Sequence, residues 1–386
     1  MISYIIPTRD RPEQLALTLS VMGRLSAADH ERSGGGEIIV VDNASRFVPV
    51  LPKRLANGLP VHLVLRGKND GAAARNVAAR HASGEWLVML DDDSHPMDTA
   101  FIGVLMGVPG EVAAVGGEVF LPSGTRESGG LPEVFVGCAV AIRREVFLDP
   151  YLGSGAASCR VFNGAGYDPA FNYYAEEYDL SARMILGGWR VVHSRGFRVL
   201  HHKAAPGRDM NSILRRLVRN NAWVEQRYAP ESERRGAIQR LVSRYRAIAE
   251  KESALHGYRL GLGDLDDTLD SQPRAEMTRE QYDRFTGLEA ARTTLGRELR
   301  ARGASRVAVV GPGKNHWAVR QALSELDVEV VEDHTHAQAL VIGTLSPGPM
   351  LDAAERWGRG AFPVVTGWEP MPANPERSTR MVLAAA

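Results

Sequence analysis

The chain has 386 residues, enough for two or three domains, and its 44% hydrophobic and 24% charged content is ordinary for a globular protein. Basic and acidic residues number 46 each, which argues against a protein that binds nucleic acid or an anionic membrane. Its two cysteines cannot build a disulfide framework or a four-thiolate zinc site. No signal-peptide pattern and no run of roughly 20 apolar residues is present, so we expect a soluble, cytoplasmic protein.

Apolar runs in the first 90 residues alternate with helical segments. Strands are expected at 2–6, 37–41, 61–65 and 86–90, and helices at 12–25 and 71–84. This alternation predicts βαβ units and a mostly parallel sheet, in which ligands gather where the strands end. Asp42 and Asp91 follow two of these strands, so the candidate site begins there.

The middle of the chain has a mixed pattern. Residues 112–202 contain strand-like runs, a Gly-rich loop at 153–166 and one helix at 176–186. Residues 208–300 are predicted to be helical, and the polar stretch at 261–273 is predicted to be a linker within them.

A second, smaller α/β pattern begins at Arg306. Its Gly311-Pro312-Gly313 turn lacks the third glycine of GxGxxG, because Lys314-Asn315-His316 follow. We therefore expect a structural or dimer-forming role there, with dinucleotide binding as the alternative. The predicted domains are a core at 1–205, a helical connector at 206–300 and a small α/β domain at 301–386.

Three consecutive carboxylates, Asp91, Asp92 and Asp93, come directly after a predicted strand. Left unpaired they repel one another, and a divalent cation such as Mg²⁺ or Mn²⁺ would relieve that repulsion. In an extended chain Asp91 and Asp93 would point the same way and Asp92 the other way. The alternative is a solvated acidic turn that caps the following helix.

A second acidic group, Glu176, Glu177 and Asp179, opens the helix predicted at 176–186. The helix dipole favours acidic residues there, and Asp179 is spaced for a surface ion pair with Arg183. The functional alternative makes one glutamate a general base beside a loop rich in glycine and tyrosine. The residues by themselves favour the dipole interpretation.

His201 and His202 end a strand-like run. Neighbours on a strand face opposite sides, so at most one of them could share a metal with Asp93. The alternative is that both are ordinary polar side chains with satisfied hydrogen bonds.

Asp42 and the helix start at 71–76 are candidate ligand-binding elements. Asp42 could accept hydrogen bonds from a nucleobase or ribose, or it could form an Asx turn. Residues 71–76 could present backbone N–H groups, together with Arg75, to an anion.

In order and spacing, seven segments over residues 1–225 resemble the inverting glycosyltransferases of family 2. The segments are YIIPTRDR, IIVVDNAS, NDGAAARNVAARHASGEWLVMLDDDS, VGCAVAIRREVF, YDPAFNYYAEEYDLSARMILGGWRVV, FRVLHH and LVRNNAWV. The resemblance implies an α/β, GT-A nucleotide-sugar-binding domain with a Rossmann-like, mostly parallel mixed sheet.

The resemblance also implies residue roles. Glu177 matches the catalytic base, although Glu176-Glu177 stands where the family usually has Glu-Asp, so Glu176 stays an alternative. The divalent cation, Mn²⁺ or Mg²⁺, would be held by Asp93 of the DXD motif and by His201, with His202 as a substitute. The residues implied to bind the donor are Pro7, Thr8, Arg9, Asp42, Arg75, Asp91 and Asp92, with Asp42 on the base and Asp91 on the ribose side.

The implied reaction is metal-dependent transfer, with inversion, from a nucleoside-diphosphate sugar to a hydroxyl or amine of a soluble saccharide or small molecule. A UDP- or dTDP-sugar is the expected donor. Residues 167–174 and Trp189 supply aromatic rings that suit a sugar, and the lack of a basic amphipathic helix disfavours a lipid-linked acceptor. The alternatives are a nucleotidyltransferase of similar fold and a non-catalytic nucleotide-sugar-binding protein.

Overall fold

The computed structural model describes residues 1–152, 165–203 and 209–373. They belong to two compact units. The first unit consists of 1–93, 142–189 and 203–282, and the second of 94–141, 190–202 and 283–386. Cys159 and most of the predicted Gly-rich loop lie outside the described residues.

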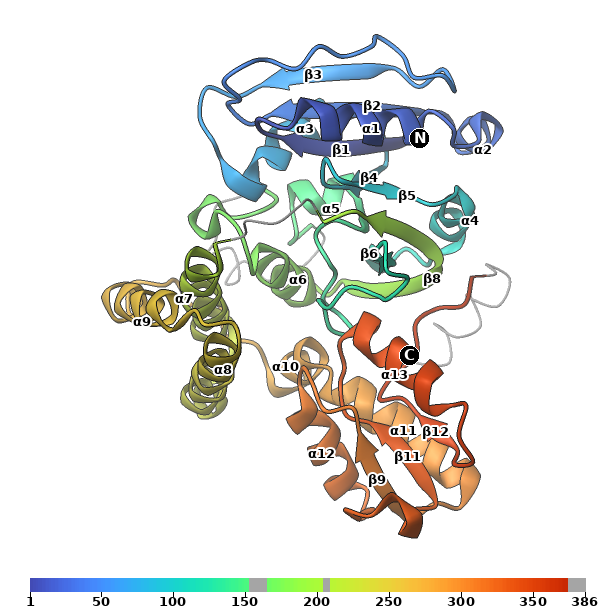
Figure 1. Ribbon diagram of the computed structural model, residues 1–386, viewed down its shortest axis with the longest axis vertical. Coiled ribbons are helices and arrows are strands. Elements are labelled where there is room, and N and C mark those ends of the chain that lie inside the picture. Colours follow the sequence, from blue (N-terminus) through green and yellow to red (C-terminus); the bar gives the residue numbers. More distant parts are fainter. Residues whose placement is uncertain (153–164, 204–208, 374–386) are drawn as a thin grey trace. The chain divides into compact units, whose positions relative to one another are not determined.

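A parallel sheet forms the centre of the first unit. Its strands, in the order β3-β2-β1-β4, are β1 (Ile2–Thr8), β2 (Gly36–Asp42), β3 (Val61–Leu65) and β4 (Trp86–Met89). β1, β2 and β4 are runs of apolar residues that are almost entirely buried, as expected of central parallel strands. The accompanying helices, seen in blue in Figure 1, are α1 (Pro12–Met22), α2 (Ala27–Arg32), the 3₁₀ turn η1 (Gly71–Ala73) and α3 (Ala74–His81).

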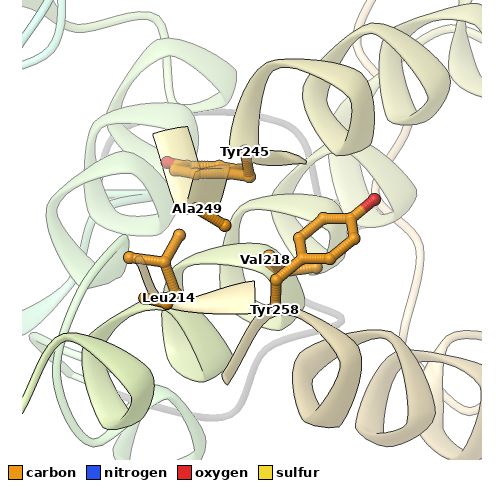
Figure 2. Packing of buried hydrophobic residues seen from close by; sticks show 6 residues of the cluster. Leu214, Val218, Tyr245, Ala249 and Tyr258 are labelled. Carbon is orange, nitrogen blue, oxygen red and sulfur yellow. The ribbon is translucent and has the colours of Figure 1, made fainter. Parts of the chain in front are cut away.

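The rest of the first unit is helical. Its elements are α5 (Arg144–Leu148), η3 (Pro169–Phe171), α6 (Glu176–Leu186), α7 (Met210–Tyr228), α8 (Glu231–Lys251) and α9 (Leu255–Thr268). Leu214 and Val218 of α7 pack with Tyr245 of α8 and Tyr258 of α9 in one buried cluster (Figure 2). The linker predicted at 261–273 is wrong over its first eight residues, which belong to α9. Gly261 is there for packing, because a Cβ on it would lie 2.6 Å from the carbonyl oxygen of Arg215 in α7.

The second unit contains the strand order β6-β8-β5, formed by β5 (Ser94–Pro96), β6 (Val112–Phe120) and β8 (Arg190–His201). β6 and β8 are parallel, and β5 is antiparallel to β8. Helix α4 (Ala100–Gly107) lies against β8, where Phe101 and Phe197 stack with ring centroids 4.6 Å apart. Strand β7 (Val140–Arg143) crosses the boundary between the units.

The same unit carries a small parallel sheet of four strands, which Figure 1 shows in orange and red. Its order is β10-β9-β11-β12, with β9 (Arg306–Val310), β10 (Glu329–Val330), β11 (Ala339–Ile342) and β12 (Val364–Val365). The remaining elements are α10 (Arg279–Thr286), which crosses the unit boundary, α11 (Leu288–Arg302), α12 (His316–Glu325), η4 (His334–His336) and α13 (Pro347–Trp357).

These sheets confirm the predicted fold class: an α/β protein with a mostly parallel mixed sheet and a second, small α/β sheet. The domain boundaries at residues 205 and 300 stay predictions. Among the described helices, none combines the length and the apolar character needed to cross a bilayer.

Candidate active site

The three aspartates after β4 lie in a turn and contact two arginines. Arg11 donates to Asp92 Oδ1 at 2.5 Å and to Asp93 Oδ2 at 2.8 Å, and Arg75 contacts Asp91. The prediction that Asp91 and Asp93 point the same way, and Asp92 the other way, is wrong. The chain turns here, and Asp92 and Asp93 both contact the guanidinium of Arg11. Arg11 and Arg75 therefore already reduce the repulsion among the three carboxylates, which a divalent cation was expected to relieve.

The environment of this acidic turn is buried. Asp92 is 4% exposed and also accepts a hydrogen bond from Thr8 Oγ1 at 2.8 Å. Burial raises the pKa of Asp92 to about 6, even though Arg11 and Thr8 lower it. Burial alone would lower the pKa of Arg75, but neighbouring carboxylates, first that of Asp91, hold it above its ordinary value.

The ends of β1 and β2 bring the predicted base-binding residues together. Pro7 and Thr8 pair with Val41 and Asp42 in the parallel register. Asp42 is buried, and its Oδ1 accepts the backbone N–H of Ser45 at 3.2 Å, the contact of an Asx turn. Arg9 is exposed, and its Nε donates to the carbonyl of Ala44 at 3.4 Å.

The helix start at 71–76 uses its first N–H groups internally. Gly71 N–H donates to Asn69 Oδ1 at 3.0 Å, and Ala72 N–H donates to the carbonyl of Asn172 at 2.7 Å. Gly71 has φ +60°, and a Cβ on it would lie 2.3 Å from that carbonyl oxygen. These two groups therefore fasten the loop that precedes α6, which does not support the prediction that they bind an anion.

A strained loop leads into α6. Asn172, Tyr174 and Ala175 have φ values of 62°, 72° and 67°, in the left-handed region that non-glycine residues rarely adopt. Asn220 of α7 is fully buried, and its Nδ2 donates to the carbonyls of Phe171, Tyr173 and Tyr174 at 2.8–2.9 Å. Strain of this kind persists only where the surroundings enforce it. Asn220, which the sequence showed only as part of a resemblance, thus holds the start of α6 in place.

The two glutamates at this helix start have different surroundings. Glu176 is half-buried, and its Oε2 is buried without a hydrogen-bond partner among the described residues. Burial and then the charge of Glu177 raise the pKa of Glu176 well above its ordinary value, while Arg75 lowers it. Glu177 acts electrostatically on Tyr178 and on Tyr245 of α8, raising the pKa of each beyond the effect of burial. Glu176 is thus linked to Arg75, and Glu177 lies near α8.

Asp179 belongs to a buried network. It accepts hydrogen bonds from Arg183 Nε at 2.9 Å, Arg227 Nη1 at 2.9 Å and Tyr228 Oη at 2.6 Å. The predicted ion pair between Asp179 and Arg183 is present, but the prediction that it lies at the surface is wrong. α7 packs against α6, and the two side chains are 0% and 2% exposed. Asp179 therefore joins the two helices.

The two histidines at the end of β8 contact different partners, as expected of neighbours along an extended chain. His201 Nδ1 lies 2.5 Å from Glu127 Oε2 and 3.6 Å from Cys138 Sγ. His202 Nε2 lies 3.4 Å from His95 Nε2. Carboxylate, imidazole and thiol are metal-ligand types, and Cys138 and His201 offer ligand atoms within 4.8 Å of each other.

Sequence reasoning missed Arg11, Glu127 and His95. These residues meet their partners from distant segments, so no local spacing could have pointed to them.

Residues 3–147 match the family model described as glycosyl transferase family 2. Over these residues the chain is similar to glycosyltransferase family 2. The matched segment contains the opening strand, Asp42 and the acidic turn at 91–93, in agreement with the resemblance found in the sequence.

Two curated relatives carry related names. An uncharacterized glycosyltransferase of Haemophilus influenzae is 34% identical over 94 residues, which are 24% of this chain and 29% of that protein. The O-antigen biosynthesis protein RfbC of Myxococcus xanthus is 25% identical over 243 residues, covering 54% of this chain and 18% of that protein. The chain thus spans less than a third of the length of either relative.

Solved structures show weaker likeness. GalNAc-T7 with UDP, GalNAc and Mn²⁺ has a TM-score of 0.46 at 17% identity, covering 60% of this chain and 48% of that one. A mannosyltransferase of Pyrobaculum calidifontis, in complex with GDP-Man and Mn²⁺, has a TM-score of 0.42 at 16% identity, with coverage of 85% and 86%.

Proposed function

We propose that this protein is a metal-dependent, inverting glycosyltransferase. It moves a sugar from a nucleoside-diphosphate sugar, with uracil or thymine as the expected base, to a hydroxyl or amine of a soluble saccharide or small molecule. The observation that carries this proposal is the family 2 match over 3–147, which includes Asp42 and the acidic turn at 91–93. Arg75 adds support, because it contacts Asp91 and acts electrostatically on Glu176 in the same unit.

The donor is proposed to bind at the ends of β1, β2 and β4. Asp42 would accept hydrogen bonds from the base, and Asp91 would bind the ribose side. Pro7, Thr8, Arg9 and Asp92 would complete the walls of this site. Arg75 is positively charged and largely buried, so it can hold Asp91 in one orientation while a diphosphate is bound.

The proposed ligands are of residue types that bind a divalent cation. Asp93 offers a carboxylate and His201 an imidazole, and both types bind Mn²⁺ or Mg²⁺, with carboxylate preferred by the harder ion. When bound, the cation would stabilise the negative charge that develops on the departing diphosphate. His202 is the substitute ligand of the proposal. Arg11 contacts Asp93 Oδ2 at 2.8 Å and so helps to fix the position of this carboxylate.

The acceptor would be deprotonated by a carboxylate at the start of α6. Glu177 is the proposed base and Glu176 the alternative, because a single group must reach the acceptor proton. A carboxylate with a raised pKa binds the proton that it removes more tightly. Burial raises the pKa of Glu176, and this property is the reason to keep Glu176 as the alternative base. The loop at 171–175 and Asn220 position both glutamates. Direct attack from the face opposite the diphosphate would invert the anomeric carbon.

The test compares the two glutamates in one background. Glu177→Gln should lower the rate of transfer at least 100-fold while donor affinity, measured by calorimetry with a UDP-sugar and Mn²⁺, stays within about twofold. Glu176→Gln is the matched comparison, since it makes the same change one residue away. If Glu177→Gln turns over at the wild-type rate and Glu176→Gln does not, the assignment of the base moves to Glu176.

Product analysis separates the proposed reaction from its rivals. The proposed reaction releases a nucleoside diphosphate, whereas a nucleotidyltransferase would release pyrophosphate from a nucleoside triphosphate. Donor binding without turnover over a panel of sugar acceptors would contradict an enzymatic role. Activity that is unchanged after removal of divalent cations with a chelator would contradict metal dependence.

A further inference from the structure

The loop that follows β6 carries Glu127, which contacts the predicted metal ligand His201. Glu127 Oε2 lies 2.5 Å from His201 Nδ1, and the two side chains are only 12% and 8% exposed. The backbone N–H of Glu127 donates to the carbonyl of Val119 at 2.8 Å, which fixes the loop beside β6. Glu127 is therefore held where it can act on the imidazole.

This contact sets the chemistry of the histidine. When Glu127 is ionised it can only accept a hydrogen bond, and a neutral His201 then carries its proton on Nδ1 and its lone pair on Nε2. A cation binds the nitrogen that carries the lone pair. Metal-binding histidines generally donate their other N–H to a carboxylate or carbonyl, which orients the ring and increases its basicity. Cys138 Sγ, 3.6 Å from the same Nδ1, borders the ring beside Glu127.

Ion pairs to α13 hold the loop next to Glu127. Arg126 Nη1 lies 2.7 Å from Asp352 Oδ1, and Arg126 Nη2 lies 2.7 Å from Glu355 Oε1. The backbone N–H of Arg126 also donates to Asp352 Oδ2 at 2.9 Å. The Arg126 side chain is 7% exposed, and Glu118 of β6 lies 3.4 Å from its Nε. Asp352 and Glu355 are more exposed, at 32% and 53%, but several charges that form a network contribute more than an isolated surface pair.

The start of α13 also holds the backbone of this loop. The side-chain Oγ of Ser346, the residue before α13, accepts the N–H of Gly129 at 3.1 Å and donates to the carbonyl of Gly129 at 2.7 Å. A Cβ on Gly348 would lie 2.2 Å from the carbonyl oxygen of Glu127. The first turn of α13 thus lies directly against the backbone of Glu127, and only glycine allows this approach.

We propose that the C-terminal α/β part of the chain positions the metal site: α13 fixes the loop at 126–130, and Glu127 then orients His201 toward the cation. Glu127 is a positioning residue, since it acts through His201. This inference rests on the proposed function, in which His201 is a metal ligand. It gives the small C-terminal sheet a role that the sequence did not reveal.

The test measures Mn²⁺ affinity of the full chain by calorimetry. Glu127→Gln and Gly348→Ala should each weaken Mn²⁺ binding about 10- to 100-fold, the range typical when a partner of a metal ligand is lost. Gly103→Ala in α4 is the matched control, because its Cβ would meet no atom within 4 Å, and its affinity should equal that of the wild type. Nitrogen NMR of ¹⁵N-histidine should show Nδ1–H for His201 in the wild type and a changed tautomer population in Glu127→Gln.

The outcomes separate the two proposals. A wild-type protein that binds no Mn²⁺ would contradict the proposed metal-dependent function itself. A wild-type protein that binds Mn²⁺ with the same affinity as Glu127→Gln and Gly348→Ala would overturn the positioning role alone. Should Gly348→Ala fail to fold, the double variant Asp352→Asn, Glu355→Gln removes the two ion pairs between Arg126 and α13 with little change in shape, and the same weakening is expected.

Discussion

Glu176 and Asp179 lie three residues apart in one helix, yet their carboxylates have opposite surroundings. Asp179 is fully buried and accepts hydrogen bonds from Arg183, Arg227 and Tyr228. Glu176 has a buried oxygen without a hydrogen-bond partner among the described residues, and its pKa is raised by burial. A carboxylate whose oxygens all accept hydrogen bonds stabilises the fold and has few lone pairs left for a substrate. A buried carboxylate oxygen without a hydrogen bond lowers stability, but it can still accept one from a substrate.

The acidic residues at 176–179 thus serve two purposes, one structural and one chemical. Acidic residues at a helix start are favoured by the helix dipole whatever they do, so the sequence treats them alike. Their hydrogen-bond partners distinguish them.

Removing the charge of Asp179 should have the largest effect. Asp179→Asn leaves Arg183 and Arg227 buried opposite a neutral amide, which should lower the free energy of unfolding by about 3–5 kcal/mol. Denaturant unfolding followed by circular dichroism measures it. Asp168→Asn is the matched control: Asp168 pairs with the same Arg227 at 2.8 Å but is 28% exposed, so its loss should cost at most about 1 kcal/mol. Equal losses in both variants would contradict the role of the buried network.

Removing the support of the strained loop should have an intermediate effect. Asn220→Ala leaves the carbonyls of Phe171, Tyr173 and Tyr174 without their donor, which should cost about 1–3 kcal/mol and lower transfer activity. Asn221→Ala is the neighbouring control, because the Nδ2 of Asn221 donates only to Leu217 in its own helix. A melting curve and an initial-rate assay of each variant suffice. Activity that survives Asn220→Ala would show that α6 does not need this support.

Replacing Glu176 by glutamine should have the smallest effect, a change in how thermal stability depends on pH. Because the folded pKa of Glu176 lies above its unfolded value, the stability it contributes is fully present below about pH 4 and is lost as pH rises through the folded pKa. Glu176→Gln cannot ionise, so its melting temperature relative to the wild type should rise between pH 4 and pH 8. Melting temperatures at matched pH values measure the difference. A difference that stays constant with pH would mean that Glu176 titrates as an ordinary surface glutamate.

Much of the fold could be predicted because the strands are apolar runs with polar ends. Residues 61–65, 112–120 and 306–310 form strands with the bounds of their apolar runs, and the helix at 176–186 begins and ends as expected. β5 was missed because Ser94–Pro96 has three residues and no apolar run. The strand-like run at 134–142 is largely irregular, since only its last three residues belong to β7 (Val140–Arg143).

The site was predicted as a set of acids, without most of their partners. Asp91–Asp93 and Glu176–Glu177 stand out because carboxylates after a strand or before a helix are visible in the sequence. Their partners are not, since Arg11 lies 81 residues from Asp92 and Arg227 lies 48 residues from Asp179. Only folding brings such pairs together. For the same reason, the sequence could not show that the ion pair between Asp179 and Arg183 is buried: the helix that packs against it, α7, lies further along the chain.

The close approach of Gly71 to Asn172 has an evolutionary consequence. Any side chain at position 71 would collide with the carbonyl that the loop before α6 presents to it, so that loop would have to take another path. Gly71 and Asn172 are 101 positions apart along the chain, yet their two segments can change only together. In an alignment of close homologues, exchange of this glycine should therefore coincide with altered length or composition around residues 171–175.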